Sequence, residues 1–261
     1  IVLKKNKKIE HEILVIDDNS SEKIKINIKN FETIKKLRIL TLKKNLGSQK
    51  AIAVGLKYLK NRKKNFLITV MDGDGEDDPN QVLKMIDNAN QNPKHIITSN
   101  RERREESLII VSLYKLHLII TFLFTCKWIS FGNFSTFYKD NLKNLLSNNF
   151  SWYAHSSSVL KNCNIIRLYS KRKKRYFDKS KLGLITLFEH SLRVNVVFYK
   201  NIFQMSLVYL FLIFFLFEYN IKILFASGIL FYNLLILIIK LKHWIKNLSG
   251  ISKFIKKIDS V

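Results

Sequence analysis

Five acidic residues fall within seven positions, Asp72–Asp78 (DGDGEDD), of a chain that is otherwise strongly basic. Asp72 and Asp74 are separated by one glycine, so a turning loop can bring both carboxylates to the same cation. Mg²⁺ in proteins is typically held by one or two carboxylates together with the phosphates of a substrate. The segment therefore predicts a divalent-cation site on Asp72 and Asp74, beside a phosphate-bearing ligand.

Two other interpretations of this segment make different demands. A calcium-binding EF-hand loop that began at Asp72 would need glycine at its sixth position and glutamate at its twelfth, but the chain has Asp77 and Leu83 there. A solvated acidic turn would instead place Asp77 and Asp78 near the positive end of a following helix. The EF-hand is excluded, and the acidic turn stays open, above all for Asp77 and Asp78.

Short β-rich runs alternate with segments of helical periodicity over the first hundred residues. Strands are expected within 12–20, 37–45, 65–79 and 95–101, and helices within 47–61 and 80–91. This alternation is typical of an α/β fold with a parallel sheet. In such sheets ligands bind at the carboxyl ends of the strands. Asp17 and Asp18 follow one predicted strand and the acidic loop follows another, so both clusters fall where a ligand is expected.

Two long apolar segments follow in the last quarter of the chain. No charged residue occurs between Lys200 and Glu218, or between Lys222 and Lys240. Each run is close to the ~20 residues that cross ~30 Å of hydrocarbon as a helix. We therefore expect a two-helix transmembrane hairpin at 200–241. The lysines on both flanks place those flanks, and the domain before them, in the cytoplasm by the positive-inside rule.

Two further segments are expected at the membrane surface. The apolar stretch 107–128 carries Lys115 and His117 near its middle, which favours an interfacial helix over a plain crossing. The basic segment 242–261 is faintly amphipathic and is expected to form a cytoplasmic tail on the lipid headgroups.

Composition limits the other classes of protein. The 261 residues include 45 Lys and Arg against 20 Asp and Glu, a formal charge of +25, yet 47% are hydrophobic, which excludes global disorder. Two cysteines, Cys126 and Cys163, exclude a disulfide scaffold and a four-cysteine zinc site. The charge alone would suit nucleic acid or an anionic membrane, and part of it reflects AT-rich codons. Nucleic acid is not expected as a partner, because no motif for it is present and it would not explain the hairpin.

Six segments in order resemble the motifs of one enzyme family. They are VIDDNS (15–20), the Asn45/Gly47/Ala51/Gly55 pattern, VMDGDGEDDP (70–79), SNRERREES (99–107), FGNFSTFYKD (131–140) and RYFDKSKL (175–182). Together they resemble family-2 glycosyltransferases of the GT-A fold, and among these the dolichol- or polyprenyl-phosphate sugar transferases that end in a membrane hairpin. The resemblance runs from about residue 12 to 182, and the hairpin extends it to 241.

The resemblance implies a catalytic GT-A domain over 1–195, with a Rossmann-like, mostly parallel sheet. It implies inverting, metal-dependent transfer, of hexosyltransferase type, from a nucleoside diphosphate sugar to a polyprenyl phosphate. The implied donor-binding residues are Asp17, Asp18, Asn45, Gly47 and Asp72; the Mg²⁺ or Mn²⁺ ligands are Asp72, Asp74 and Glu76. The implied acceptor-phosphate residues are Arg104, Arg175, Ser180 and Lys181, and the catalytic residues are Asp74, Arg101 and Arg175.

The chain departs from the family's pattern at three places. The family's first strand, with its Pro-x-x-Asn-Glu loop, is expected to be missing from this sequence, because few residues precede Val15. Asn133 stands where the family has aspartate, and Asp178 where it has glycine. These departures leave open a non-catalytic basic membrane adaptor on the same fold, or a transferase with another lipid or glycan acceptor.

Location and assembly follow from the same resemblance. We expect a multi-pass protein of the bacterial inner (plasma) membrane with its catalytic domain in the cytoplasm. Hairpin proteins of this kind often form homo-oligomers, a state that the sequence leaves open.

Overall fold

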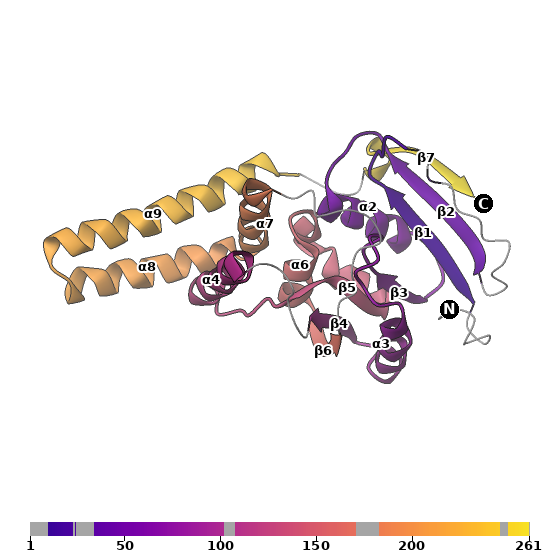
Figure 1. The fold of residues 1–261 in the computed structure, drawn as a ribbon, viewed down its shortest axis with the longest axis horizontal. Helices are drawn as coiled ribbons and strands as arrows, with labels where there is room; N and C mark the ends of the chain where they lie inside the picture. The colour runs from indigo at the N-terminus through magenta and orange to yellow at the C-terminus, as the bar shows by residue number, and fades with distance from the viewer. Residues whose placement is uncertain are drawn as a thin grey trace.

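The computed structural model of the chain describes residues 10–22, 24, 34–101, 108–170, 183–245 and 250–260, and the structural statements below concern these residues. They form an α/β domain from which a long helical hairpin projects (Figure 1). The α/β class that the alternation of strands and helices predicts is confirmed.

The elements have the following bounds. The strands are β1 (His11–Asp17), β2 (Ile34–Leu42), β3 (Leu67–Val70), β4 (His95–Arg101), β5 (Phe131–Tyr138), β6 (Asn164–Ser170) and β7 (Ile255–Ser260). The α-helices are α2 (Ser48–Lys60), α3 (Asn80–Gln91), α4 (Leu108–Thr125), α5 (Leu142–Leu145), α6 (His155–Asn162), α7 (Leu184–Val196), α8 (Tyr199–Leu216) and α9 (Tyr219–Lys242). The short 3-10 helices are η1 (Lys139–Asn141), η2 (Ser147–Trp152) and η3 (Ile251–Lys253).

The described strands form two sheets, with the orders β1-β2-β7 and β3-β5-β4-β6. β1 and β2 are parallel, as are β4 and β6, whereas β7 and β5 run antiparallel to their neighbours. The expected mostly parallel sheet is therefore only partly correct. The prediction rested on the regular alternation of strands and helices, and this alternation ends at Arg101. β5 and β7 follow longer excursions, through α4 and through the hairpin, and enter the sheets in the opposite direction.

Helices cover both faces of the four-stranded sheet. Neighbouring residues of a strand point to opposite faces. Ile96 therefore packs with α2, α5 and α6 on one side, while Ile97 packs with α3 on the other. Phe137 and Phe134 of β5 divide in the same way. All four side chains are buried, so this sheet forms the middle layer of the core.

Helix α2 lies against β1 at a close approach that requires glycine. A Cβ atom added at Gly55 would lie 2.9 Å from Cγ1 and Cδ1 of Ile16, closer than side-chain contacts normally come. Ala51, Ala53 and Val54 of the same helix are buried beside this contact. The close packing fixes the start of α2 relative to the end of β1, where the predicted donor-binding residues lie.

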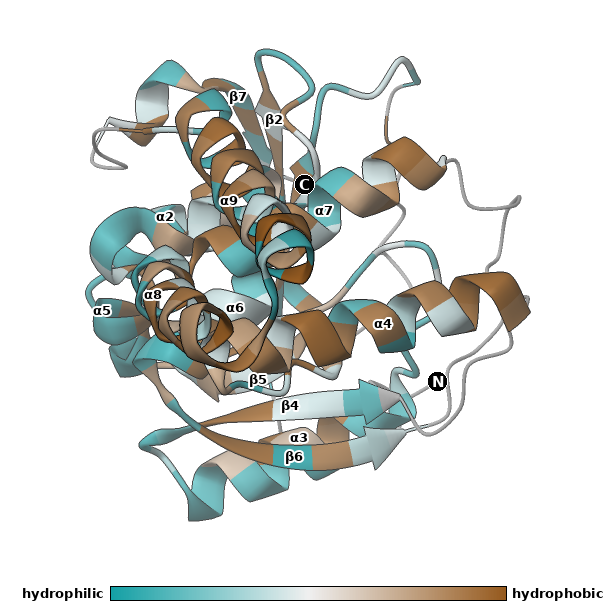
Figure 2. Ribbon diagram, turned by 90° about the vertical axis from the view of Figure 1, so that its left-hand side faces the viewer, coloured by the Kyte–Doolittle hydropathy of each residue, from teal (hydrophilic) through white to brown (hydrophobic). Residues whose placement is uncertain are grey.

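The hairpin of α8 and α9 projects from the domain (Figure 1), and most of its ribbon has the colour of hydrophobic residues (Figure 2). Many of its large apolar side chains are exposed. Both helices are long and apolar enough to cross a membrane, with mean hydropathies of 1.5 and 2.2. Inside the hairpin, Asn233 of α9 donates a hydrogen bond to Ser206 of α8 at 2.7 Å. These helices match the apolar pair expected from the sequence.

Helix α4 runs across the base of the hairpin. Figure 1 shows α8 and α9 lengthwise and α4 nearly end-on, and Figure 2 shows the reverse. The Tyr209 hydroxyl of α8 donates a hydrogen bond to the Leu123 carbonyl of α4 at 2.6 Å. By length and composition α4 is also a candidate membrane span, with a mean hydropathy of 2.0. Its crosswise direction fits the expected interfacial helix.

The structure places the C-terminal segment differently from the expected tail on the headgroups. Strand β7 pairs with β2, with Ile258 opposite Leu40. Ahead of it, Ile251 is buried and Phe254 packs on Trp152, with ring centroids 5.1 Å apart. The prediction of a separate basic tail is wrong for residues 250–260. The apolar side chains of this segment pack into the core of the domain, and β7 covers the edge of β2.

Candidate active site

The loop between β2 and α2 is held in place by the acid that follows β1. Asp18 accepts hydrogen bonds from the backbone N–H groups of Leu46 and Gly47, each at 2.7 Å. Asn45 also accepts from the Gly47 N–H, at 3.2 Å. Gly47 has a φ of +85°, a conformation that side chains other than glycine rarely adopt. Three of the predicted donor-binding residues, Asp18, Asn45 and Gly47, are therefore together at the start of α2.

A chain of hydrogen bonds joins this helix start to the acidic loop after β3. The Asn133 amide of β5 donates to Asp72 Oδ1 at 3.1 Å. Asn133 in turn accepts from the Gln49 amide of α2 at 3.1 Å. The side-chain oxygen of Gln49, Oε1, accepts from the His155 backbone N–H at 2.7 Å. Because Gln49 lies two residues after Gly47, the two acidic strand ends share one structural support.

Within the acidic loop, carboxylates hold the backbone in its turn. Asp77 accepts a hydrogen bond from the Asp72 N–H at 3.0 Å, and Asp74 accepts one from the Glu76 N–H at 3.1 Å. Asp78 accepts from the N–H of Asn80, the first residue of α3, at 3.0 Å. The last two acids thus shape the loop and the start of α3, as the acidic-turn interpretation expects for them. Asp72 and Asp74 remain the residues that can present oxygen to a cation.

A divalent cation fits Asp72 and Asp74 by the chemistry of their oxygens. The described residues contain no group of three or more His, Cys, Asp or Glu that could hold a metal by themselves. Mg²⁺ does not require one, since it takes one or two carboxylates and completes its shell with water and substrate phosphates. The amide of Asn133 neutralises no charge, so Asp72 keeps its negative charge for an ion. Glu76 lies on the same turn, but it does not form a three-carboxylate group with Asp72 and Asp74, so the structure does not bring the predicted set of three ligands together.

Other predicted site residues take different positions. Asp17 is buried and accepts from the Ser20 N–H at 2.9 Å, which stabilises its own turn. Arg101 is the last residue of β4, where its backbone pairs with Ser170; its side chain is outside the described structure. The four predicted acceptor-phosphate residues lie outside the described residues: Arg104, Arg175, Ser180 and Lys181.

Two residues of this network are not evident from the sequence pattern. Gln49 falls between matched positions of the Asn45–Gly55 motif, and no spacing rule singles it out. His155 is fully buried, and its ring Nε2 shares a 2.9 Å hydrogen bond with the Ser135 hydroxyl. Burial lowers the pKa of His155 to about 4, so the ring is neutral at pH 7. The neutral ring therefore supports β5 through Ser135, while the backbone N–H of His155 supports Gln49.

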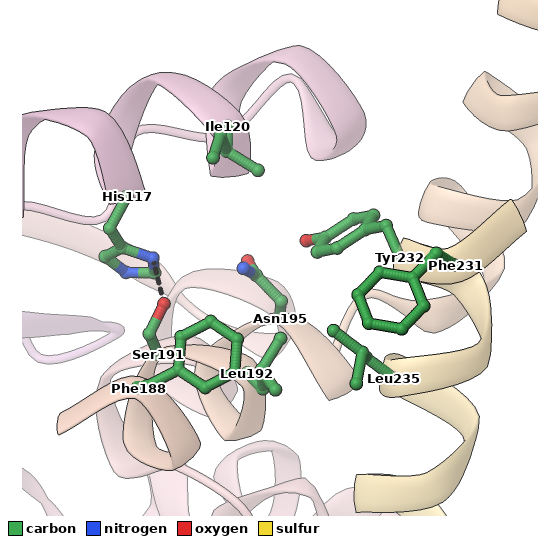
Figure 3. A pocket seen from close by; sticks show the side chains of 9 residues that line it. All are labelled: His117, Ile120, Phe188, Ser191, Leu192, Asn195, Phe231, Tyr232 and Leu235. Carbon is green, nitrogen blue, oxygen red and sulfur yellow. Dashed lines mark hydrogen bonds between the residues drawn. The ribbon is translucent and has the colours of Figure 1, made fainter. Parts of the chain in front are cut away.

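An apolar cavity of about 140 Å³ lies between α4, α7 and α9, apart from the acidic loop (Figure 3). Its polar lining includes His117, which shares a 2.6 Å hydrogen bond with Ser191, and Asn195, which accepts from Thr121 at 2.9 Å. The rest of the wall is mainly aromatic and aliphatic. A space of this kind suits part of a hydrocarbon chain better than a sugar nucleotide.

Comparison with known proteins identifies the class. Residues 2–156, more than half of the chain, match the model of glycosyl transferase family 2, and the chain belongs to this family. The matched region includes both acidic strand ends, α2, and the Asn133 and His155 that connect them. The resemblance that the six segments predict is confirmed.

One curated relative adds a narrower likeness. The chain is 26% identical over 101 residues to dodecaprenyl-phosphate galacturonate synthase of Rhizobium johnstonii (strain DSM 114642 / LMG 32736 / 3841). The similar region is 38% of this chain and 29% of that protein, so the match spans under a third of the relative's length.

Proposed function

We propose that the protein transfers a sugar from a nucleoside diphosphate sugar to a polyprenyl phosphate, with inversion at the anomeric carbon. The observation that carries the proposal is the hydrogen-bonded chain Gln49–Asn133–Asp72, which connects the two acidic strand ends in a family-2 chain joined to an apolar hairpin. Support for a lipid phosphate as acceptor comes from the likeness to dodecaprenyl-phosphate galacturonate synthase.

On the donor side, the leaving group is a nucleoside diphosphate whose charge grows as the sugar departs. Asp72 and Asp74 would hold Mg²⁺ or Mn²⁺, which acts as a Lewis acid for such a leaving group. Asn133 keeps Asp72 in one orientation, and Asp18 fixes the backbone around Gly47, where the nucleotide is proposed to bind. The protein's own contribution is to hold these oxygens in place before the donor arrives.

On the acceptor side, a phosphate oxygen is already an anion at neutral pH, so no strong general base is needed. The neutral side chain of Asn133 is consistent with this chemistry. Positive charge is needed to bring the two anions together, and the proposed groups are Arg101, Arg104, Arg175 and Lys181, with Ser180 as a hydrogen-bond donor. Arginine suits the task because its planar fork can contact two phosphate oxygens.

The proposed setting is the inner membrane of a bacterium. In this arrangement α8 and α9 cross the bilayer, the lysine-rich ends of the hairpin face the cytoplasm, and α4 lies along the surface. The apolar cavity between α4, α7 and α9 then opens at the depth where a polyprenyl chain would run. Homo-oligomers are compatible with this arrangement.

The test uses the full chain in nanodiscs that contain polyprenyl phosphate, with Mg²⁺ or Mn²⁺ and a panel of nucleoside diphosphate sugars. We expect release of nucleoside diphosphate that requires both the lipid and the cation. The variant Asp74→Asn should lose the release, and Asp87→Asn, an exposed acid of α3, should keep it. No release with any donor, from folded protein, would contradict the proposal and favour the basic membrane adaptor.

A further inference from the structure

A cluster of basic side chains lies where the hairpin joins the domain. Figure 1 shows α7 between the base of the hairpin and α2 with α6. At this junction α7 contributes Glu189 and Arg193, the end of α9 contributes Lys242 and His243, and α2 contributes Lys50. None of these residues belongs to the predicted site.

Ion pairs, hydrogen bonds and a cation–aromatic contact link these five residues. Glu189 accepts from Lys242 Nζ and pairs with His243 Nε2, both at 2.7 Å. Arg193, one turn further along α7, donates to the Trp152 carbonyl at 3.3 Å. Lys50 Nζ lies 5.3 Å from the centroid of the Trp152 ring. Trp152 therefore joins α2 to α7, as Glu189 joins α9 to α7.

The cluster has more positive charge than its one carboxylate neutralises. Lys50, Arg193 and Lys242 carry three positive charges against one negative charge on Glu189. Among the described residues, neither Lys50 nor Arg193 has a carboxylate within ion-pair distance, and the buried Arg193 Nε has no hydrogen-bond partner. Such an excess of charge in a half-buried place attracts an anion.

The electrostatics of individual groups agree with this excess. Burial lowers the pKa of Lys50, and the positive charges of Arg193, Lys44 and Lys242 lower it further. Burial is also the main cause that lowers the pKa of His243, so its ring is neutral at pH 7. The net charge of the five residues is then about two positive charges, which a phosphate monoester dianion would balance.

The place of the cluster indicates where the anion comes from. Tyr199 begins α8 and Lys242 ends α9, so the cluster lies at the end of the hairpin nearest the domain. Trp244, two residues after the end of α9, is 62% exposed, as is common for tryptophan at headgroup depth. On its other side, Lys50 is next in sequence to Gln49, which contacts the Asn133 that holds Asp72. The cluster thus lies between the lipid surface and the acidic loop.

We propose that Lys50, Arg193 and Lys242 form a binding site for a phosphate monoester, and that its ligand is the phosphate of the membrane-borne lipid acceptor. The inference rests on the proposed function for the identity of the acceptor. The site adds α2, α7 and α9 to the basic residues that the family resemblance assigns to the acceptor. Glu189 holds Lys242 in position, so the cluster exists before the lipid arrives.

The first experiment measures binding without turnover. Full-length protein, in the absence of donor, is titrated with nanodiscs of neutral lipid, of neutral lipid with polyprenyl phosphate, and of neutral lipid with phosphatidylglycerol, a phosphate diester. Lys50→Gln should weaken binding to the polyprenyl phosphate discs by about tenfold, since it removes one charge-assisted contact. Lys57→Gln on the same helix should leave it unchanged, and Lys50→Arg should retain most of it.

Three results would overturn the inference. One is that Lys50→Gln loses as much binding to phosphatidylglycerol discs as to polyprenyl phosphate discs, which would mean that the cluster binds any anionic lipid surface. Another is displacement of the polyprenyl phosphate discs by inorganic phosphate at equal concentration, which would mean a site for free phosphate. The third is unchanged binding by folded Lys50→Gln protein.

A second experiment separates this inference from the proposed function. In the transfer assay, Lys50→Gln should raise KM for polyprenyl phosphate about tenfold and leave KM for the donor unchanged. If the wild type transfers sugar and Lys50→Gln has the same KM for polyprenyl phosphate and for the donor, the phosphate site at Lys50 is wrong and the proposed function stands. Binding that depends on Lys50 in a protein without transferase activity would do the opposite.

Discussion

The acidic loop and the basic cluster at the junction of hairpin and domain (Lys50, Arg193 and Lys242) are both linked to the first turn of α2. They differ in how their charges are compensated. Asp72 of the acidic loop accepts from a neutral amide, and Asp18 after β1 accepts from backbone N–H groups, so the charge of both carboxylates is oriented but not cancelled. At the junction, the one carboxylate, Glu189, pairs with the cation Lys242 and with the His243 ring, and an excess of positive charge remains on Lys50 and Arg193. Gln49 belongs to the first region and Lys50 to the second.

This difference assigns the two regions to different ligands. Oriented carboxylates suit a cation that a diphosphate then completes, whereas uncompensated cations suit a phosphate that arrives from the membrane. Because one helix turn carries both, the two anions of the proposed reaction would be guided toward each other.

The largest effect is expected at Asp74, a predicted ligand of the cation. Asp74→Asn should lower the rate of transfer by about a hundredfold or more, because it removes one charged ligand from the centre where negative charge develops. Its Tm should stay close to that of the wild type, since asparagine keeps an oxygen for the Glu76 N–H. Steady-state rates and a thermal melt measure both quantities. If Asp74→Asn transfers sugar at the wild-type rate, a cation held by Asp74 is not needed for the reaction.

The neutral histidine beneath the acidic region should make folding sensitive to pH. The folded-state pKa of His155 is about 4, below its ordinary value of 6.5, so the unfolded chain binds more protons between these values. The contribution of His155 to stability is therefore complete above pH 6.5 and is lost as the pH falls toward 4, by about 3 kcal/mol.

Chemical unfolding in detergent between pH 7 and 4 measures this loss. The wild type should lose more stability over the interval than His155→Gln, which has no group that titrates there. Parallel pH profiles for the two proteins would show that His155 is not buried as the structure has it.

Substitution of Asn133 should separate orientation from charge. Asn133→Ala leaves Asp72 and Gln49 without their shared partner and should lower activity about tenfold, with a loss of about 1 kcal/mol in stability. Asn133→Asp places a second negative charge beside Asp72, so its Tm should rise with added Mg²⁺ more than that of the wild type. Equal Mg²⁺ responses in melting curves of the two proteins would place the cation elsewhere.

The smallest effect is expected at the start of α2. Gly47→Ala must adopt a φ near +85°, which costs about 1 kcal/mol, although no atom lies within 4 Å of the new Cβ. Gly73→Ala is the matched control, since its surroundings are equally open and no positive φ is found there. The free energy of unfolding should fall only for Gly47→Ala, and equal values would mean that the Asp18 loop is not held in this conformation.

Local patterns predicted the parts of the fold that local physics determines. The alternation of apolar runs indicated the strands and helices up to Arg101, and the uncharged runs indicated α8 and α9. The pairing of β7 with β2 could not be predicted in this way, because it joins residues more than two hundred positions apart. The same distance in sequence explains why 242–261 was expected to be a separate tail.

The candidate site divides in a similar manner. Asp72 and Asp74 were evident from their own spacing, and Asp18 from its place after a strand. Gln49, Asn133 and His155 are connected only by the fold, across separations of 84 and 106 residues. Lys50 and Arg193 belong to a common cluster for the same reason. A sequence can indicate the residues that carry charge, while their partners depend on tertiary contacts.

The most direct test of the central claim is the mass of the lipid after reaction. Polyprenyl phosphate in nanodiscs is incubated with the protein, Mg²⁺ and the donor that gives the fastest release of nucleoside diphosphate, and is then extracted for mass spectrometry. We expect a lipid that is heavier by one sugar residue and retains a single phosphate. A lipid of unchanged mass, or one that gains a sugar together with a second phosphate, would contradict it.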